Sequence, residues 1–414
     1  MRKTLGRTPH TVMTLLAGAG LLLAAGCVTR RPYMDSAVLR ERILSPLEPA
    51  APSPKTPTRG LREKAAVLPS GPLTLQDAIA IALANNLTLK LSMEDLAIAE
   101  QQVHVARSLF LPQVTAGYSY DIRDREVEQI LGAQAVPLAE KEFQRAELKV
   151  QMTVWDFGRS LGNYLQAKLG KEIARLTMQR VRQKVIYEVT QAYFNVLRAQ
   201  KARDIAAEAL EQARAHLKTA RSLYVNGVVD KNDVLRAEVH VAEVRQQLIS
   251  AENAVKISIS VLNNVLGINV NSPTIVKDVT EAPEFEMDLV SALQTAIDHR
   301  PEFKLVQKGI RMEEAGWTAA WGEHFPRIYV AGSLKRLDDD YQAHKNSALG
   351  EIGIQMELFN GWRTTAQIRV AERRIRKAAE TAKQVCDAIA LEVKQALLGI
   401  EEARKRLALS LIHI

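Results

Sequence analysis

Cysteine and aromatic residues are scarce in this 414-residue sequence. The two cysteines, Cys27 and Cys386, lie far apart in different surroundings, which excludes a disulfide framework. Only 5% of the residues are aromatic, although 47% are hydrophobic. A chain this hydrophobic is not disordered, and its middle is rich in Ala, Leu, Gln, Glu and Arg. This composition is typical of long helices rather than of one large globular core.

The motifs of enzymes are missing as well. Asp156-Phe157-Gly158 resembles the metal-binding triplet of kinases, but no glycine-rich loop, strand lysine or HRD-like loop accompanies it. The eight histidines show no HExxH pattern and no pairing with cysteine. We therefore expect a protein that is not an enzyme and that has no catalytic residue, cofactor or metal site.

A patch of positive charge is also absent. The net charge is +8, but Lys and Arg alternate with Asp and Glu along the expected helix faces instead of gathering in one place. This pattern argues against nucleic acid as a partner.

The N-terminus has the layout of a bacterial export signal. Arg2, Lys3 and Arg7 precede an uncharged apolar run over residues 12–25, which is too short to predict a membrane-spanning helix. The run ends in Leu-Ala-Ala-Gly before Cys27, an ending that resembles a bacterial lipoprotein box. We expect residues 1–26 to be a signal peptide and Cys27 to carry acyl chains such as palmitate. The alternative is an ordinary signal peptide in which the cysteine is incidental.

Residues 27–72 join this lipidated cysteine to the rest of the chain. Eight of the 15 prolines fall in this stretch, and no apolar period is visible. Because proline-rich chain is extended and semi-rigid, we predict a tether that carries the fold away from the acylated end.

From residue 73 the sequence follows one plan twice, over residues 73–287 and 288–414. Two helices lead to LPQVTAG at residues 111–117 in the first copy, and two more lead to FPRIYVAG at residues 325–332 in the second. An internal repeat of this kind predicts two copies of one supersecondary unit.

Each copy contains two stretches in which apolar and polar residues alternate. They predict four β-strands, at about residues 113–123, 146–156, 327–335 and 348–358. About ten residues of such alternation span a bilayer as a tilted strand. The side chains expected to face lipid are Val114, Tyr118, Leu148, Val150, Met152, Ile352, Ile354 and Met356. A soluble sheet packed on a core would show the same alternation and is the alternative.

Four strands cannot close a barrel within one chain. An open sheet edge in lipid leaves backbone groups unpaired at several kcal/mol each, so the chain must oligomerise if these strands enter a membrane. Two copies would supply eight strands and three would supply twelve, and strand counting alone does not choose between them. Residues 123–145 and 335–347, which connect the strands, are expected to be polar loops.

A long helical hairpin is predicted over residues 159–266. Apolar residues recur in steps of four and three, and alanine returns every seventh residue from Ala192 to Ala220. This period predicts left-handed coiled-coil packing of two helices that meet at a turn, Asn226-Gly227. The second copy contains only the outgoing helix, and its turn would fall beyond Ile414. We therefore expect a truncated sequence that lacks the second return helix; the alternative is a natural short form whose last helix lacks its partner.

Four motifs in order resemble the TolC-like outer-membrane factor family, in particular its lipoprotein branch. They are LTLQDAIAIALANN, ARSLFLPQVTAGYSY, VWDFGRS and LYVNGVVDKNDVLRAEV. The resemblance covers residues 73–414 and implies an α+β membrane protein. It implies a homotrimer whose shared twelve-stranded β-barrel continues as an α-barrel of coiled-coil hairpins. It also implies a periplasmic adaptor (membrane fusion protein) and an inner-membrane pump as partners.

The hairpin tip meets the adaptor in that family. The matching positions in this sequence are Gly227, Val228, Val229, Asn232, Asp233 and Val234. The alternative for these residues is turn chemistry, with a positive φ at Gly227 and a helix N-cap at Asp233.

The resemblance predicts a passive exit duct in a tripartite efflux or type I secretion system, with the energy supplied by the pump. It predicts a lipid-anchored protein of the bacterial outer membrane that extends into the periplasm. The alternative is a periplasmic coiled-coil scaffold lipoprotein that forms no pore.

Overall fold

The computed structural model describes residues 71–131, 134–279 and 285–412, so Cys27, the expected signal peptide and nearly all of the expected tether lie outside the described residues. Within these ranges the chain is mostly helical with some sheet, an α+β protein. The first elements are α3 (Leu75–Asn85), α4 (Leu87–Arg107), η1 (Ser108–Phe110), β1 (Gln113–Ile122), β2 (Val127–Leu131), β3 (Gln134–Ala139), β4 (Glu142–Trp155), α5 (Arg159–Val225) and α6 (Lys231–Leu266). They are followed by α7 (Leu289–His299), α8 (Pro301–Gly322), β5 (Arg327–Asp338), β6 (Asn346–Gln355) and α9 (Arg363–Ile412).

Side-chain caps and left-handed glycines set several helix ends. The Thr74 side chain accepts a hydrogen bond from the backbone at the start of α3, and Asn86 does the same for α4. Beyond the end of α5, Gly227 has a φ of 72°, and Gly267 at the end of α6 also has a φ of 72°. These are the conformations for which glycine carries no steric penalty.

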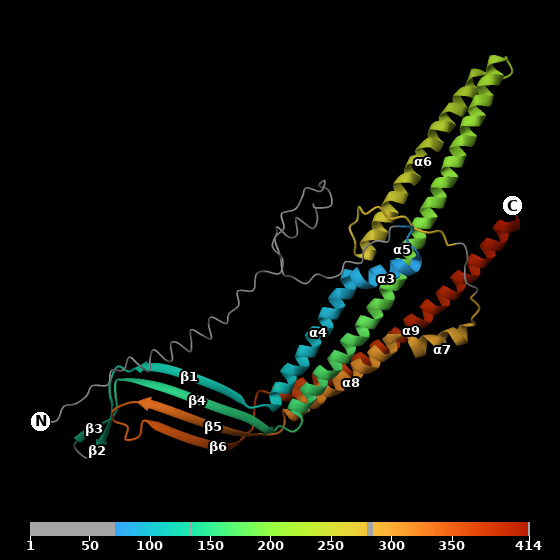
Figure 1. Cartoon of the computed structure of the whole chain (residues 1–414). Helices are drawn as coiled ribbons and strands as arrows, with labels where there is room; N and C mark the ends of the chain where they lie inside the picture. The colour runs from blue at the N-terminus through green and yellow to red at the C-terminus, as the bar shows by residue number, and fades with distance from the viewer. Residues whose placement is uncertain (1–70, 132–133, 280–284, 413–414) are drawn as a thin grey trace. The chain divides into compact units, whose positions relative to one another are not determined.

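The larger sheet is antiparallel, with the strand order β1-β4-β5-β6 (Figure 1). Leu148 in β4 lies opposite Ala116 of β1 and Leu334 of β5. Because side chains alternate along a strand, this register places the apolar residues of the four strands on one face and most of the polar residues on the other. Within the described residues no strand pairs with the outer side of β1 or of β6, so both are edge strands.

The strand connections differ from the expected loops. Residues 123–145, expected to be a polar loop, contain the β2–β3 hairpin, and β4 starts earlier than expected, at Glu142. β5 continues to Asp338 because β4 offers it a partner as far as Gln144. β6 ends at Gln355, where its partner strand begins just after Pro326, a residue without a backbone N–H.

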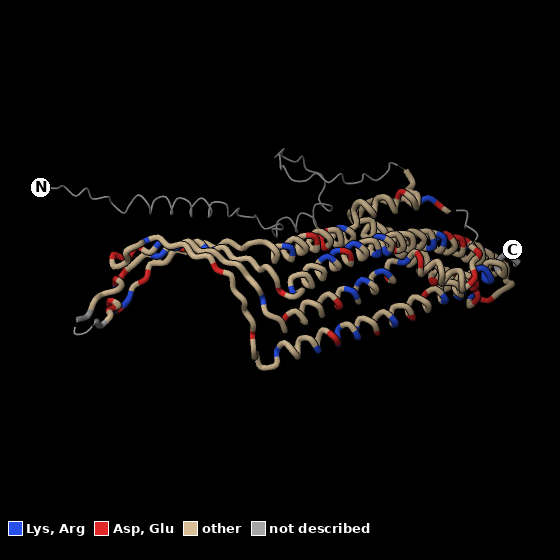
Figure 2. Tube along the Cα trace, turned by 90° about the horizontal axis from the view of Figure 1, so that it is seen from below, with Lys and Arg blue, Asp and Glu red and all other residues tan. Residues whose placement is uncertain are grey.

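Four helices continue the four strands in the same order. α4 leads through η1 into β1, β4 into α5, α8 into β5 and β6 into α9, and contacts join α4 to α5, α5 to α8, and α8 to α9. Figure 2 shows positive and negative residues interspersed along these helices. With 67 residues, α5 is about 100 Å long. Among the described helices, none is both long enough and apolar enough to cross a membrane.

The main core lies where α3, α5 and α6 meet. Val189, Tyr193 and Leu262 are completely buried there. The Tyr193 hydroxyl oxygen lies 2.8 Å from the carbonyl oxygen of Leu73 and 2.6 Å from that of Lys277. The segments that precede α3 and follow α6 are thereby fastened to the middle of α5.

Candidate functional site

One face of the four-stranded sheet is apolar and open. The register places on it seven of the side chains expected to face lipid: Val114, Tyr118, Leu148, Val150, Met152, Ile352 and Ile354. Ile352 is 81% exposed and Ile354 72% exposed. Burying such a side chain is worth about 1.5–3 kcal/mol, so this face suits an apolar environment outside the chain. Met356, the eighth expected position, follows the end of β6 instead of lying within a strand.

The opposite face of the sheet carries charge. Lys335 lies 3.7 Å from Glu147 on the neighbouring strand, and Arg145 lies 3.6 Å from Asp121. These ion pairs are partly exposed, which is compatible with water on this side. The sheet is therefore a wall with one apolar and one hydrated surface.

Aromatic side chains gather where the strands join the helices, and strand alternation does not predict them. The rings of Phe157 and Phe325 stack at 4.9 Å, and Trp321 packs edge-on to Phe325 at 6.2 Å. All four tryptophans of the chain lie in or next to this zone, at Trp155, Trp317, Trp321 and Trp362. Aromatic belts mark the boundary between lipid and water, so this zone fits a membrane interface. Tryptophans beside the expected strand ends were the signal that could have revealed it.

Both corners that lead from a strand into a helix contain an aromatic residue in a left-handed conformation. Phe157 has a φ of 53° next to Gly158 at 92°, and Trp362 has a φ of 64° next to Gly361 at 66°. Large residues rarely adopt positive φ values, because this backbone conformation costs free energy. The surrounding structure must therefore stabilise the aromatic residue at each corner. Asp156 starts the first corner and accepts a hydrogen bond from the Ser160 backbone N–H at 2.8 Å, so Asp156-Phe157-Gly158 forms a strand-to-helix turn.

The tip of the α5–α6 hairpin is apolar and projects into solvent. Val228 is 67% exposed, and Leu223, Tyr224 and Val225 beside it are exposed as well. Of the other expected tip residues, Asn232 and Asp233 are exposed, and Val229 and Val234 are half-buried. The three exposed residues that end α5 belong to the LYVNGVVDKNDVLRAEV motif, but the expected docking positions begin only at the turn, at Gly227.

Asp233 is not the N-cap of α6, so this part of the alternative reading of the tip, turn chemistry, is wrong. The cap position belongs to Asp230, whose backbone is extended (φ −81°, ψ 160°). Asp233 lies in the first helical turn, and its backbone N–H donates to the Asp230 carbonyl oxygen at 3.0 Å. A negative side chain in the first turn still favours the helix through its dipole.

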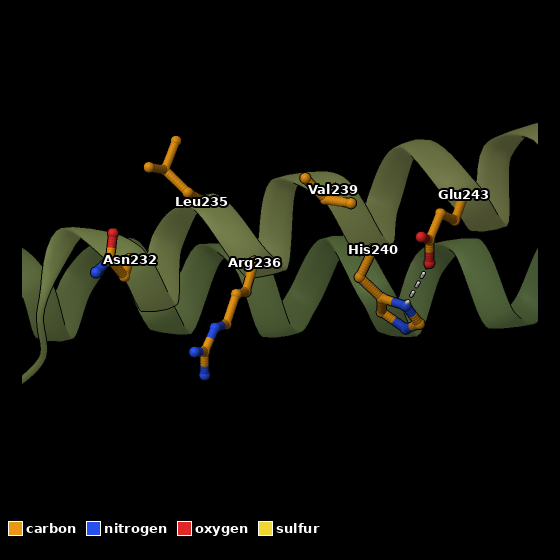
Figure 3. A pocket seen from close by; sticks show the side chains of 6 residues that line it. All are labelled: Asn232, Leu235, Arg236, Val239, His240 and Glu243. Carbon is orange, nitrogen blue, oxygen red and sulfur yellow. Dashed lines mark ion pairs between the residues drawn. The ribbon is translucent and has the colours of Figure 1, made fainter.

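An open groove of about 570 Å³ continues from the tip along α6 (Figure 3). Its exposed apolar side chains are Leu235 and Val239, and His240 Nδ1 lies 3.9 Å from a Glu243 carboxylate oxygen. Nearby, Arg221 of α5 pairs with Glu238 of α6 at 2.7 Å and ties the two helices together. Within the described residues, no group of three His, Cys, Asp or Glu side chains is placed to hold a metal ion.

An amphipathic sheet, an aromatic belt and a long helical hairpin with an apolar tip define a channel subunit of the outer-membrane type. The family model described as outer membrane efflux protein matches residues 78–268 and 292–411, and the chain belongs to this family. It is therefore an outer-membrane channel component of efflux or secretion, and it is not an enzyme.

Individual relatives are distant but cover most of the chain. Outer membrane efflux protein BepC of Brucella suis biovar 1 is 21% identical over 340 residues, which cover 81% of this chain and 71% of that protein. Protein CyaE of Bordetella pertussis is 22% identical over 340 residues, with 80% and 70% covered. The solved structure of the CmeC outer membrane channel of Campylobacter jejuni has the same fold. It aligns with a TM-score of 0.67 at 16% identity and covers 87% of this chain and 82% of that one.

Proposed function

We propose that three copies of this chain form the outer-membrane exit duct of a tripartite efflux or type I secretion system. The proposal rests mainly on the four-stranded sheet, which has one open apolar face and, in the part of the chain that the structure describes, two edges without a partner strand. Three such sheets joined edge to edge give a closed twelve-stranded barrel without unpaired backbone groups in lipid. Apart from the β2–β3 hairpin, which interrupts the first copy, the order helix, helix, strand, strand, long helix occurs twice. This order supports an internal duplication that supplies two strands of the larger sheet each time.

In this duct the apolar face of the sheet meets lipid and the charged face lines the water-filled passage. The lipid-facing positions are Val114, Tyr118, Leu148, Val150, Met152, Ile352 and Ile354, with Met356 at the edge of the layer. The aromatic belt marks the boundary at which the barrel passes into an α-barrel built from α4, α5, α8 and α9. In this proposal transport through the duct is passive, and the pump supplies the energy.

The hairpin tip is the docking point for a periplasmic adaptor, which in turn contacts an inner-membrane pump. Gly227 sets the turn, and Val228 offers an apolar contact. Exposed apolar side chains clustered at one end of a rigid hairpin are the kind of surface that a partner protein covers. The docking surface comprises Val228, Val229, Asn232, Asp233 and Val234, extended by Leu223, Tyr224 and Val225.

A covalent lipid on Cys27 anchors the chain to the outer membrane. The lipoprotein-box ending before Cys27 supports this proposal. Replacing Cys27 by Ser removes the acceptor thiol, so labelling with radioactive palmitate should be lost. Labelling that persists in the variant would remove the anchor from the proposal.

Conductance across a planar lipid bilayer tests the duct. The full-length protein should insert and give ion current, whereas a periplasmic coiled-coil scaffold would give none. A parallel measurement of mass in detergent should find three copies per particle. A water-soluble monomer without current would overturn the proposal.

A further inference from the structure

A single side chain of the four-stranded sheet is buried among the described residues, and it lies on the charged face. Phe143, near the start of β4, is 3% exposed. The guanidinium carbons of Arg123 and Arg145 lie 4.6 and 5.7 Å from the centre of its ring. Because Phe143 shares its face with Glu147 and Lys149, it points to the side that we assign to the passage.

Asp339 is the second buried group at this end of the sheet. It directly follows β5 and is 1% exposed. One carboxylate oxygen, Oδ1, accepts the backbone N–H of Glu140 at 3.2 Å and that of Tyr341 at 3.0 Å. Glu140 belongs to the connection between β3 and β4, so Asp339 joins two connections that are far apart in the sequence.

The neighbours of Asp339 behave differently. Asp338 and Asp340 are exposed, and both pair with Lys345 of the same connection, at 2.7 and 2.9 Å. Neither holds a second connection in place. Asp339 is therefore the acidic residue of this trio that fixes one loop to another.

The contacts place part of the chain over the charged face. Lys335 and Leu337 of β5 lie on that face, and continued alternation puts Asp339, the first residue after the strand, on the same side. The Glu140 backbone meets the Asp339 side chain, and the Arg123 backbone N–H donates to the Lys141 carbonyl oxygen at 2.8 Å. The second bond extends the ladder between β1 and β4, whereas the first holds Glu140 of the β3–β4 connection against the passage side of the sheet, at the end remote from the helices.

We propose that this cluster narrows the outer mouth of the duct and sets the size of solute that can pass. The mouth cluster consists of Arg123, Glu140, Phe143, Arg145 and Asp339, once in each subunit. Asp339 is a positioning residue: it touches no solute but keeps the β3–β4 connection folded inward. The inference rests on the proposed duct, since only a passage lined by the charged face has a mouth at this place.

Size-graded thiol labelling from outside the cell tests the proposal. Lys149, an exposed residue on the charged face of β4, is six residues from Phe143, or about 20 Å along the strand. The probe is Lys149→Cys in a Cys386→Ser background, in the full chain assembled in the outer membrane. Maleimides of increasing polymer size are added to intact cells. Small reagents should react, and large ones should react slowly because the mouth cluster excludes them.

Asp339→Ala in the probe background should raise the labelling rate of the large reagents about tenfold. Losing a buried acceptor of two backbone N–H groups should raise the fraction of molecules in which the β3–β4 connection has moved away from the sheet by about this factor. Asp339→Asn keeps the accepting Oδ1 and should behave like the parent. Asp340→Ala removes a carboxylate of the same loop that holds no second connection, so it should leave the size limit unchanged. Phe143→Ala should also raise the labelling rate of the large reagents. It replaces Asp339→Ala in the test if Asp339→Ala assembles poorly.

The outcomes separate the two proposals. If Lys149→Cys reacts with no reagent in any background, the charged face does not line a passage, and the duct itself is wrong. If Lys149→Cys reacts equally with all sizes in the parent, or if both Asp339→Ala and Phe143→Ala leave the size limit unchanged, the duct stands and the mouth cluster is not a constriction.

Discussion

Gly162 of α5 lies so close to Ala319 of α8 that a Cβ atom on the glycine would be 2.6 Å from the Ala319 backbone nitrogen. The same atom would be 2.7 Å from the carbonyl oxygen of Ala315. Since both neighbours are backbone atoms, they cannot move aside as a flexible side chain could. This contact fixes the distance between α5 and α8 close to the ends at which they join β4 and β5.

Gly162→Ala should therefore destabilise the protein, although alanine favours helix. We expect a loss of about 1–3 kcal/mol from overpacking. The matched control is Gly170→Ala in the same helix, where a Cβ meets nothing within 4 Å. That change should be neutral or stabilise by up to about 1 kcal/mol. Thermal unfolding in detergent, followed by circular dichroism, measures both, and equal melting temperatures for the two variants would contradict the close contact.

Leu148→Arg tests whether the apolar face of the sheet meets lipid. A charged side chain on the lipid face of a barrel costs about 2–4 kcal/mol at mid-depth. The control is Gln151→Arg, which places the same charge on the opposite face of the same strand. Folding into lipid vesicles, measured by protection from protease, should fall for the first variant only. Equal folding of both would favour a sheet that remains in water.

Val228→Asp should weaken adaptor docking at the hairpin tip. A buried hot-spot contact contributes about 2 kcal/mol or more, which is roughly a thirtyfold loss of affinity. Ile275, which follows α6 and lies away from the tip, has the same exposure of 67%, so Ile275→Asp is the control. Crosslinking in cells should decrease for Val228→Asp, and also for the charge reversal Asp233→Lys, while the oligomer stays intact. Unchanged crosslinking would place the docking surface elsewhere.

Tyr193→Phe should loosen the core at the middle of α5. Burial raises the pKa of Tyr193, so its hydroxyl remains a hydrogen-bond donor over the physiological range. Removing it leaves the carbonyl groups of Leu73 and Lys277 without this partner, at a cost of about 1–2 kcal/mol. Tyr187→Phe, on an exposed position of the same helix, is the control. If urea unfolding shows the same stability for the two variants, the Tyr193 hydroxyl does not stabilise the fold through Leu73 and Lys277.

The Lys201–Asp278 ion pair predicts a pH dependence. The Lys201 ammonium, 2.9 Å away, lowers the pKa of the Asp278 carboxyl, and the carboxylate raises the pKa of Lys201. A carboxyl with a lowered folded pKa stabilises the fold above its unfolded value of about 3.9, and this contribution is lost as the pH falls through the folded value. The raised Lys201 pKa contributes below the unfolded lysine value of about 10.4 and is lost at higher pH.

The melting temperature of the parent should therefore exceed that of Lys201→Met at pH 7, and the gap should close below about pH 4. Because both side chains are exposed, we expect the gap to be small. Scanning calorimetry at several pH values measures it. A gap that is the same at pH 3 and pH 7 would show that the variant acts by something other than charge.

The helical part of the fold could be predicted because its signal is local and periodic. Val185, Val189, Ala192 and Val196 belong to one stripe in the sequence, and all four are buried. A period of 3.5 residues can hold over a long helix only if one side packs against neighbours. The strand faces could be predicted for a similar reason. Successive side chains of a strand point to opposite faces whichever strand pairs with it.

Features that depend on distant partners could not be predicted. The burial of Asp339 arises from a hydrogen bond to Glu140, 199 residues away, and the neighbouring aspartates look the same in sequence. The end of β6 depends on Pro326, which directly precedes its partner strand β5. Asp230 and Asp233 are equally plausible helix caps by residue type, and the extended backbone of Asp230 decides between them.

The outer sides of β1 and β6, which pair with no other strand in the described ranges, affect how the protein inserts and assembles. A lone subunit that entered lipid would carry two rows of backbone amides without hydrogen-bond partners. Insertion before association is therefore unfavourable in free energy. Entry and association should then occur together, and the rate at which inserted protein accumulates should rise more steeply than in proportion to subunit concentration. When a cell makes less of the chain, the number of inserted channels should therefore fall more steeply than the total amount of the protein.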